Sequence, residues 1–144
     1  MTKIVSFNIN GVRARPHQIE AIRDLLDADV IGLQETKAHD EVFPLADIEA
    51  MGFHAEFFGQ KSHYGVALLS KKPPLNVQKG WPWAEEDAQR RLIHAEYNIN
   101  GERWHILNGY FPQGESIDHE IKFPAKRAYY ADLMRYLSEN FTPD

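Results

Sequence analysis

The sequence contains no cysteine, which excludes disulfide bonds, zinc sites built on thiolates and a cysteine nucleophile. It also contains no run that approaches the ~20 apolar residues of a membrane-spanning helix. A single lysine precedes Ile4, and no apolar core of the kind found in a signal peptide follows it. We therefore expect a soluble protein of the cytoplasm that makes no membrane contact.

A basic excess is missing too, since the formal net charge is -5 at pH 7. Such a balance is unusual for a nonspecific nucleic-acid binder, which is normally basic. Net charge is a poor guide here, however, because several cations are clustered, namely Lys71, Lys72, Arg90, Arg91, Lys122, Lys126 and Arg127. Clusters of this kind are most often simply solvated, so charge leaves DNA binding open.

Several catalytic signatures are also absent. The chain has no Gly-rich phosphate loop and no serine nucleophile elbow, and its seven histidines form no pair at metal-ligand spacing. What is present is ordinary for a globular protein. A length of 144 residues, with 43% hydrophobic and 26% charged residues, indicates one domain with a real core.

Hydrophobic patterning predicts a mixed α/β chain with a layered sheet as its core. Residues 92–97 alternate between apolar and polar side chains, and Asn100-Gly101 joins them to an apolar run at residues 103–110, which predicts a β-hairpin. Shorter apolar runs predict strands, the first two of them buried, at residues 3–7, 30–33, 53–58 and 66–70.

Helices are predicted between these strands and at the end of the chain. Pro16 suits the first turn of a helix, and residues 44–51 predict a short helix stopped by Gly52. Residues 124–139 predict a longer helix. The expected apolar faces of the first and last helices consist of Ile19, Ile22, Leu25 and Leu26, and of Tyr130, Leu133, Met134 and Leu137.

Polar side chains stand at three of the predicted strand ends. Asn8 ends the first strand, Glu35 follows the second, and Tyr110 opens a polar segment after the hairpin. A strand–helix–strand opening with parallel strands places Asn8 and Glu35 at the same sheet edge. We expect Glu35 to share the strand face of Ile31 and Leu33. Fixed polar groups at strand ends predict a binding site for a charged ligand.

Glu35 is the candidate metal ligand of this site. A buried carboxylate must be paired, protonated or metal-bound, and oxygen ligands favour Mg²⁺, with Mn²⁺ as an alternative. Asn8 would hold the metal or orient Glu35, and the Tyr110 phenol would hold a phosphate oxygen or take part in proton transfer. The ordinary alternatives stay open, namely a solvated or salt-bridged Glu35, a turn-capping Asn8 and a core-edge Tyr110.

Six further polar side chains are candidates for phosphate contacts, although each taken singly is more often just solvated. They are Asn10, Arg13, Tyr64, Arg91, Gln113 and Lys122. The residues alone therefore indicate a weakly defined site for a divalent metal and a phosphate.

The order of four segments is more specific than any single residue. The segments are residues 6–15 (SFNINGVRAR), 31–37 (IGLQETK), 63–67 (HYGVA) and 108–114 (NGYFPQG). In this order they resemble the exonuclease III family, the apurinic/apyrimidinic endonucleases of the endonuclease/exonuclease/phosphatase superfamily. The resemblance implies the N-terminal part of a four-layered α/β sandwich with a mixed, mostly antiparallel sheet. It also implies magnesium-dependent phosphodiester hydrolysis at abasic sites and 3′ ends of duplex DNA.

The resemblance assigns roles to individual residues. Glu35 matches the metal-binding glutamate of the family, Asn8 the asparagine beside it, and Tyr110 the active-site tyrosine that contacts the scissile phosphate. Positions implied to touch DNA are matched by Arg91, Gln113 and Lys122.

The resemblance also implies an incomplete domain, in which residues 1–144 are the N-terminal portion of a single family domain. The Gly-Asp-x-Asn segment, with its water-activating aspartate, and the Ser-Asp-His segment, with the catalytic histidine, do not follow the last helix. Asp132 and Asp144 lack the flanking pattern and offer no substitute. A half sandwich should expose apolar surface, which favours association with another chain.

Two alternatives from other classes stay open. The chain could be a noncatalytic fragment that binds DNA weakly or requires a second chain to fold. It could also share the chemistry but not the substrate, since superfamily relatives hydrolyse phosphoinositides or sphingomyelin. The surroundings at residues 13–15 and 113–116, which include Glu115, favour DNA.

The 144-residue chain on its own is expected to show little or no nuclease activity, because the water-activating aspartate and the histidine are missing. A magnesium-dependent nicking assay on a duplex with one abasic site measures this. Robust cleavage that is lost on Glu35→Ala would contradict the expectation.

Overall fold

The computed structural model describes residues 1–114 and 116–142, so that Glu115 and Asp144 lie outside the described residues. The chain divides into two compact units, Met1–Tyr110 and Phe111–Asp144. The first unit contains both sheets, and the second contains one long helix.

The first sheet of unit 1 has the strand order β1-β2-β4-β3. β1 and β2 are parallel and the other pairs are antiparallel, which agrees with the predicted strand–helix–strand opening. The two central strands are buried along almost their whole length, because both of their faces are covered. The strands are β1 (Ile4–Asn8), β2 (Val30–Gln34), β3 (His54–Phe58) and β4 (Val66–Ser70).

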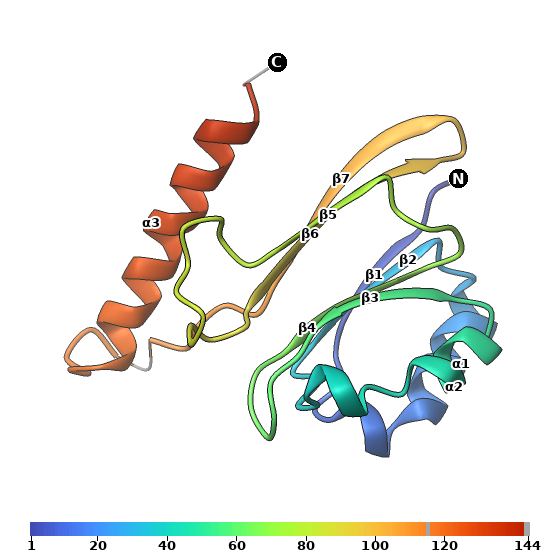
Figure 1. Ribbon diagram of the computed structural model, residues 1–144, viewed down its shortest axis with the longest axis horizontal. Coiled ribbons are helices and arrows are strands. Elements are labelled where there is room, and N and C mark those ends of the chain that lie inside the picture. Colours follow the sequence, from blue (N-terminus) through green and yellow to red (C-terminus); the bar gives the residue numbers. More distant parts are fainter. Residues whose placement is uncertain (115, 143–144) are drawn as a thin grey trace. The chain divides into compact units, whose positions relative to one another are not determined.

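Helices cover one face of this sheet (Figure 1). Pro16 occupies the first turn of α1, where its missing N–H costs nothing. Ile19 and Ile48 bring α1 and α2 onto Ile31, Leu33 and Leu69 in a fully buried cluster. The elements on this side are η1 (Val12–Ala14), α1 (Pro16–Leu26), η2 (Asp40–Val42) and α2 (Leu45–Ala50).

A second, antiparallel sheet packs on the opposite face, in the order β5-β6-β7. Asn100 and Gly101 have φ values of 54° and 84°, as a tight hairpin turn requires, so the predicted hairpin is confirmed. Ile93, Ala95 and Tyr97 face Val30 and Leu68 of the first sheet. The strands are β5 (Asn76–Lys79), β6 (Leu92–Ile99) and β7 (Glu102–Gly109), of which β5 was not predicted.

Asn108 joins the two sheets through a buried hydrogen-bond network. From β7 its amide donates to the carbonyl oxygens of Leu33 and Ala67, each at 2.9 Å. Its own oxygen accepts a hydrogen bond from Gln34 at 2.6 Å. Gly32 permits this approach, because a Cβ at that position would lie 3.1 Å from Cγ of Asn108. The side chain therefore locks β7 onto the centre of the first sheet.

The second unit contains α3 (Lys122–Asn140), slightly longer than the predicted helix. Its buried residues are Tyr129 and Tyr136, and the ring of Phe111 packs 4.8 Å from that of Tyr129. The apolar face predicted for this helix is wrong, since Tyr130 and Met134 are 45% and 64% exposed. The buried face is turned by about one residue relative to the predicted one.

Two burial predictions in unit 1 are also wrong. The first strand, β1, lies at the edge of its sheet, so Ile4 is 42% exposed and only alternate residues are covered. At the end of α1, Leu25 is 82% exposed and Leu26 is 46% exposed, because the buried part of that helix is centred on Ile19.

The mixed α/β class, with one mixed and one antiparallel sheet, agrees with the prediction, whereas the four-layered sandwich stays a prediction. Among the helices of residues 1–114 and 116–142, none combines the length and the apolar character that a membrane span requires.

Asn108→Ala is expected to lower the free energy of unfolding by about 2–4 kcal/mol, because it removes a buried amide and leaves its partners unsatisfied. Urea unfolding followed by circular dichroism measures the change. Asn98→Ala, which alters an exposed asparagine of the same sheet, serves as the control and should stay within about 0.5 kcal/mol of the parent protein. Equal losses in the two variants would contradict the structural role of Asn108.

Candidate active site

Asn8, Glu35 and Tyr110 meet at one edge of the two sheets. Asn8 is the last residue of β1 and pairs in register with Gln34, so Glu35 stands beside it. The Asn8 amide donates a hydrogen bond of 2.8 Å to Oε1 of Glu35. Tyr110 follows β7, and its phenol lies close enough to the same carboxylate to lower the pKa of Glu35. The structure thus brings together the three residues predicted at strand ends.

Glu35 does not lie on the strand face that we expected. β2 ends at Gln34, and Glu35 has a left-handed backbone with φ 53°. This turn ends the strand alternation, so the carboxylate leaves the helix-covered face of Ile31 and Leu33 and joins Asn8 instead. Left-handed backbone is uncommon outside glycine and marks a strained position.

Lys37 is a further member of the site. Its ammonium lies 3.4 Å from Oε2 of Glu35 and donates a hydrogen bond of 2.5 Å to the side-chain oxygen of Asn10. The backbone N–H of Gly11 donates to the Glu35 carbonyl at 2.8 Å. These contacts bring predicted site residue Asn10 to the carboxylate and hold the loop after β1 against the end of β2.

The surroundings of Glu35 favour its ionised form. The hydrogen bond from Asn8 is the main cause that lowers the pKa of Glu35, with Tyr110 and Lys37 adding to it and burial opposing it. Burial and the Glu35 charge raise the pKa of Tyr110, while Arg91 opposes the rise. At neutral pH the site therefore presents a carboxylate beside a protonated phenol.

Arg91 lies between two tyrosines of the site. Its guanidinium carbon is 4.6 Å from the ring centre of Tyr64 and 4.9 Å from that of Tyr110, both within cation–π range. It also donates a hydrogen bond of 3.1 Å to the Tyr110 carbonyl. The predicted residues Tyr64 and Arg91 are therefore brought to the phenol and hold its position.

The loop that carries Tyr64 is anchored under Glu35. The Tyr64 carbonyl accepts a hydrogen bond of 3.0 Å from the backbone of Lys37. Gly65 has φ 90°, and a Cβ there would lie 2.2 Å from Oγ1 of Thr36, so only glycine fits. Close backbone packing thus fixes where the Tyr64 ring can lie.

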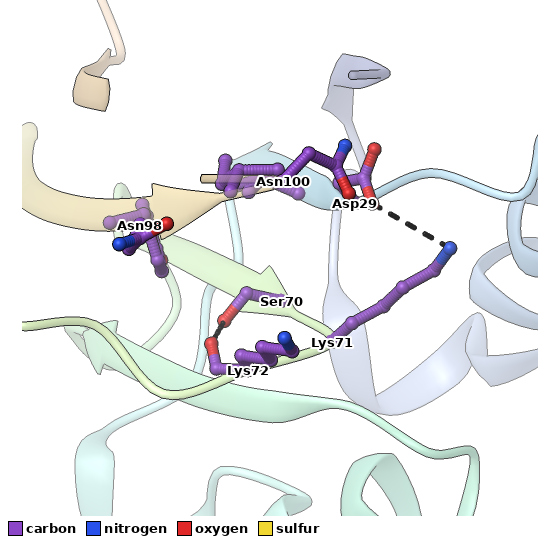
Figure 2. Close-up of a pocket in the computed structure, with 9 residues that line it drawn as sticks. Asp29, Ser70, Lys71, Lys72, Asn98 and Asn100 are labelled. Atoms are coloured by element: carbon purple, nitrogen blue, oxygen red, sulfur yellow. Dashed lines mark hydrogen bonds and ion pairs between the residues drawn. The ribbon is translucent and has the colours of Figure 1, made fainter. Parts of the chain in front are cut away.

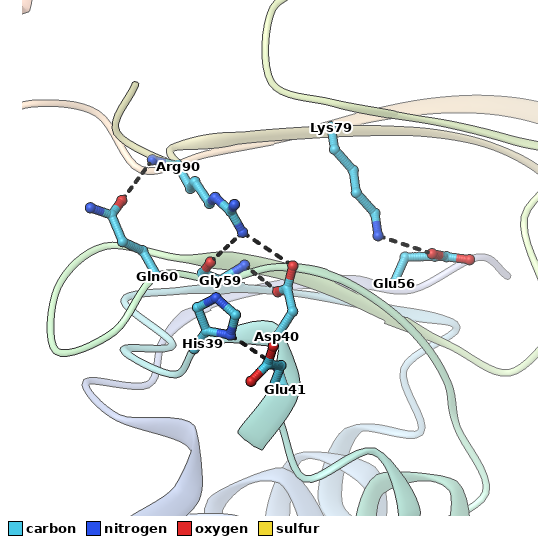
Figure 3. Close-up of polar contacts among 8 residues, drawn as sticks. All are labelled: His39, Asp40, Glu41, Glu56, Gly59, Gln60, Lys79 and Arg90. Atoms are coloured by element: carbon cyan, nitrogen blue, oxygen red, sulfur yellow. Dashed lines mark hydrogen bonds and ion pairs between the residues drawn. The ribbon is translucent and has the colours of Figure 1, made fainter. Parts of the chain in front are cut away.

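Arg90 binds the start of the same loop, at Gly59 and Gln60 (Figure 3). Its guanidinium donates to the Gly59 carbonyl at 2.7 Å and to the Asp40 carboxylate at 3.1 Å. The other oxygen of Asp40 accepts from the Gly59 N–H at 2.7 Å. The Gln60 side chain accepts from the Arg90 N–H at 3.2 Å. This network ties the segment before β6 to the end of β3.

For the remaining predicted site residues, the structure shows exposure or backbone contacts. Arg13 is exposed on η1, next to Val12, whose N–H donates to the Thr36 carbonyl at 3.0 Å. Gln113 and Lys122 belong to the second unit, where Gln113 is exposed and the Lys122 N–H donates to His119. Their contact with DNA stays a prediction.

Sequence reasoning missed Lys37 and Asn108 as site-building residues. For Asn108 a signal existed, because it shares the inward face of β7 with Trp104 and Ile106, and a polar side chain there requires buried partners. The sequence around Lys37 gives no sign that its ammonium reaches Glu35. That contact depends on the left-handed backbone of Lys37, with φ 54°.

The oxygen donors around Glu35 are compatible with a Mg²⁺ ion. Within the described part of the chain, no three His, Asp or Glu residues gather as a metal cluster. Glu35 is ionised, and each of its oxygens can accept more than the one contact described above. Mg²⁺ commonly takes one or two carboxylates and completes its shell with water and substrate phosphate. Asn8 directs its amide at Glu35 and its oxygen at the Asn10 N–H, which suits an orienting role.

Sequence comparison adds independent evidence. The sequence profile of the endonuclease/exonuclease/phosphatase family matches residues 5–141. Exodeoxyribonuclease III of Haemophilus influenzae is 54% identical over 137 residues, which cover 95% of this chain and 51% of that protein. An exodeoxyribonuclease of Bacillus subtilis is 31% identical over 129 residues, which cover 84% of this chain and 48% of that protein. The chain thus spans about half the length of these relatives.

Solved structures with the same fold agree. An AP endonuclease from Archaeoglobus fulgidus matches with a TM-score of 0.86 at 35% identity, over 99% of this chain and 53% of that one. A 3′ phosphatase from Neisseria, bound to a product DNA hairpin, matches with a TM-score of 0.84 at 33% identity, over 96% of this chain and 52% of that one. The resemblance inferred from motif order is confirmed.

Asn8→Ala is expected to raise the pKa of Glu35 toward its ordinary value, because the hydrogen bond that lowers it most is lost. Carboxyl ¹³C NMR during a pH titration measures the change. Asn76→Ala is the matched control, since Asn76 lowers the pKa of Glu96 in the same manner. That variant should move the titration of Glu96 and leave Glu35 unchanged. A Glu35 titration unaltered by Asn8→Ala would refute the assignment.

Proposed function

Because this chain belongs to the endonuclease/exonuclease/phosphatase family, we propose that it forms one side of the active site of a DNA-repair nuclease. The reaction is hydrolysis of a phosphodiester bond. The observation that carries this proposal is the grouping of Asn8, Glu35 and Tyr110, in which an ionised carboxylate, hydrogen-bonded by Asn8, lies beside a neutral phenol.

The proposed substrate is duplex DNA with abasic sites or 3′ ends. The names of relatives support this choice, since they include exodeoxyribonucleases, an AP endonuclease and a 3′ phosphatase bound to a DNA hairpin. The side chains of the site support it as well, because Lys37 lies beside Glu35 and Arg91 packs on Tyr110, and such cations commonly contact DNA phosphates. Such a substrate is consistent with the cytoplasmic location that we expected.

Glu35 is the residue proposed to hold Mg²⁺, or Mn²⁺ in its place, with Asn8 setting the angle of the carboxylate. A divalent ion at this position would neutralise the charge that develops on the phosphate during hydrolysis. Glu35 is ionised at neutral pH, and the hydrogen bond from Asn8 lowers its pKa further, so the carboxylate is ready to bind a cation. Asn8 as a direct metal ligand stays the second possibility.

Tyr110 is proposed to donate its phenolic hydrogen to an oxygen of the scissile phosphate. The raised pKa of Tyr110 keeps that proton in place at neutral pH. Arg91 packs on the ring and bonds to the Tyr110 carbonyl, so the phenol is held before substrate arrives. Tyr110, held by Arg91, would thus bind the phosphate while water attacks phosphorus and the ester oxygen leaves.

Glu35→Gln is expected to lower the rate of abasic-site cleavage by about 100-fold or more, and Tyr110→Phe by about 10-fold or more. The measurement is a nicking assay with the full-length protein and a labelled duplex, titrated with Mg²⁺. Glu35→Gln should also raise the Mg²⁺ concentration that gives half-maximal rate.

Glu49→Gln is the matched control, because Glu49 is exposed on α2, on the helix-covered side of the sheet. It should leave both the rate and the Mg²⁺ dependence unchanged. Cleavage by Glu35→Gln at the parent rate, with the parent Mg²⁺ dependence, would rule out the proposed role of Glu35.

A further inference from the structure

The sequence contains three Asn-Gly steps, at residues 10–11, 100–101 and 108–109. Such a step is chemically labile, because the backbone nitrogen of the glycine can attack the side-chain carbonyl carbon of the asparagine. Glycine leaves this nitrogen open to approach, since it carries no Cβ. Isoleucine or leucine precedes each of the three asparagines, so the local sequences are closely similar. Any large difference in their reactivity must therefore come from the fold.

Two of the three steps are held by the structure. Asn108 is 6% exposed, and its side chain makes the hydrogen bonds that join the two sheets. The side-chain oxygen of Asn10 accepts a hydrogen bond of 2.5 Å from Lys37. The N–H of Gly11, which carries the attacking nitrogen of that step, donates to the Glu35 carbonyl at 2.8 Å. Attack at either asparagine requires these contacts to break first.

The third step is open. Asn100 and Gly101 form the exposed tip of the hairpin between β6 and β7. The N–H of Gly101 makes no hydrogen bond with any residue that the structure describes, and a Cβ at this glycine would have no atom within 4 Å. Within residues 1–114 and 116–142, the Asn100 side chain hydrogen-bonds only to Thr2, donating to its hydroxyl oxygen at 3.2 Å. Both reacting groups are therefore accessible.

Local opening and water access also favour reaction at this turn. Ring closure requires Asn100, which has a φ of 54°, to rotate out of its turn conformation. Exposed turns open at little cost in free energy, whereas buried networks open only near the free energy of global unfolding. Asn100 lines a surface pocket together with Asp29 and Lys71, so water reaches its side chain (Figure 2).

We propose that Asn100 is a site of spontaneous deamidation in the folded protein. The Gly101 nitrogen gives its proton to solvent base and bonds to the side-chain carbonyl carbon of Asn100. The C–N bond of the side-chain amide breaks, and ammonia leaves with a proton taken from solvent. Water then opens the five-membered succinimide at either of its carbonyls, which gives aspartate or isoaspartate. The net reaction consumes one water and releases one ammonia.

The modification changes the hairpin tip and not the candidate active site. The product carries one additional negative charge, and isoaspartate also adds a methylene group to the main chain at the turn. Tyr110 follows the far end of β7, whose 8 residues span roughly 27 Å at ~3.4 Å per residue. The inference is therefore independent of the proposed nuclease function.

The test is incubation of the purified full-length protein at mildly alkaline pH, followed by digestion and mass spectrometry of the peptides. One sample stays folded and a second is unfolded in guanidinium chloride. In the folded sample, Asn100 should convert about tenfold or more faster than Asn10 and Asn108. In the unfolded sample the three rates should become similar, because only the local sequence then matters.

Asn98 is a matched internal control in both samples. It is exposed in the same strand, but the branched side chain of Ile99 follows it and hinders attack, so Asn98 should stay unmodified. Asn100→Gln supplies a second measurement, since its side chain would have to close a less favourable six-membered ring. The acidic species that accumulates on ion-exchange chromatography of the parent protein should be lost in this variant and kept in Asn98→Gln.

Three results would overturn the proposal. The first is an unmodified Asn100 in the folded sample at a time when it has converted in the unfolded sample. The second is conversion of Asn10 or Asn108 in the folded sample as fast as that of Asn100. The third is equal accumulation of the acidic species in Asn100→Gln and the parent protein.

Discussion

The amide of Asn108 is the contact on which the rest of this structure depends. It reaches from one sheet to two carbonyl groups in the centre of the other and is satisfied on both of its polar atoms. Two residues later the chain presents Tyr110, so the same side chain that joins the sheets also determines where the phenol meets Glu35. Apolar packing alone tolerates small slips between layers, whereas a buried amide with fixed acceptors defines one register.

Around this anchor, the site is built by backbone conformation as much as by side chains. Asn10, Glu35, Lys37 and Tyr64 all have positive φ, between 49° and 58°. Residues in this region cost free energy that the surrounding structure must offset. Here the offset comes from backbone hydrogen bonds that run between the three loops, such as Gly11 to Glu35 and Lys37 to Tyr64. The polar groups are consequently held in place before any ligand arrives.

Short sequence signals correctly predicted those parts of the fold that neighbouring residues determine. Asn100-Gly101 specified its turn, Pro16 opened its helix, and the parallel pairing of β1 with β2 placed Asn8 beside Glu35. The failures are all nonlocal. The exposure of Leu25 depends on which part of α1 packs on the sheet, and the direction of Glu35 depends on loops more than 20 residues away. Arg91 was a candidate phosphate contact by residue type and by the family resemblance, but its ring contacts join residues 64 and 110 and leave no periodic signal in the sequence.

Neighbouring arginines before β6 serve opposite sides of the chain, because successive side chains of an extended segment alternate. Arg90 binds Asp40 and Gly59, while Arg91 stacks on Tyr64 and Tyr110. One residue inserted between Arg91 and Leu92 would exchange these two directions and misplace both contacts. The length of the connection between β5 and Arg90 does not affect the direction of either arginine. We therefore expect members of this family to vary in length between residues 80 and 89, and to keep the spacing from Arg90 to the start of β6 invariant.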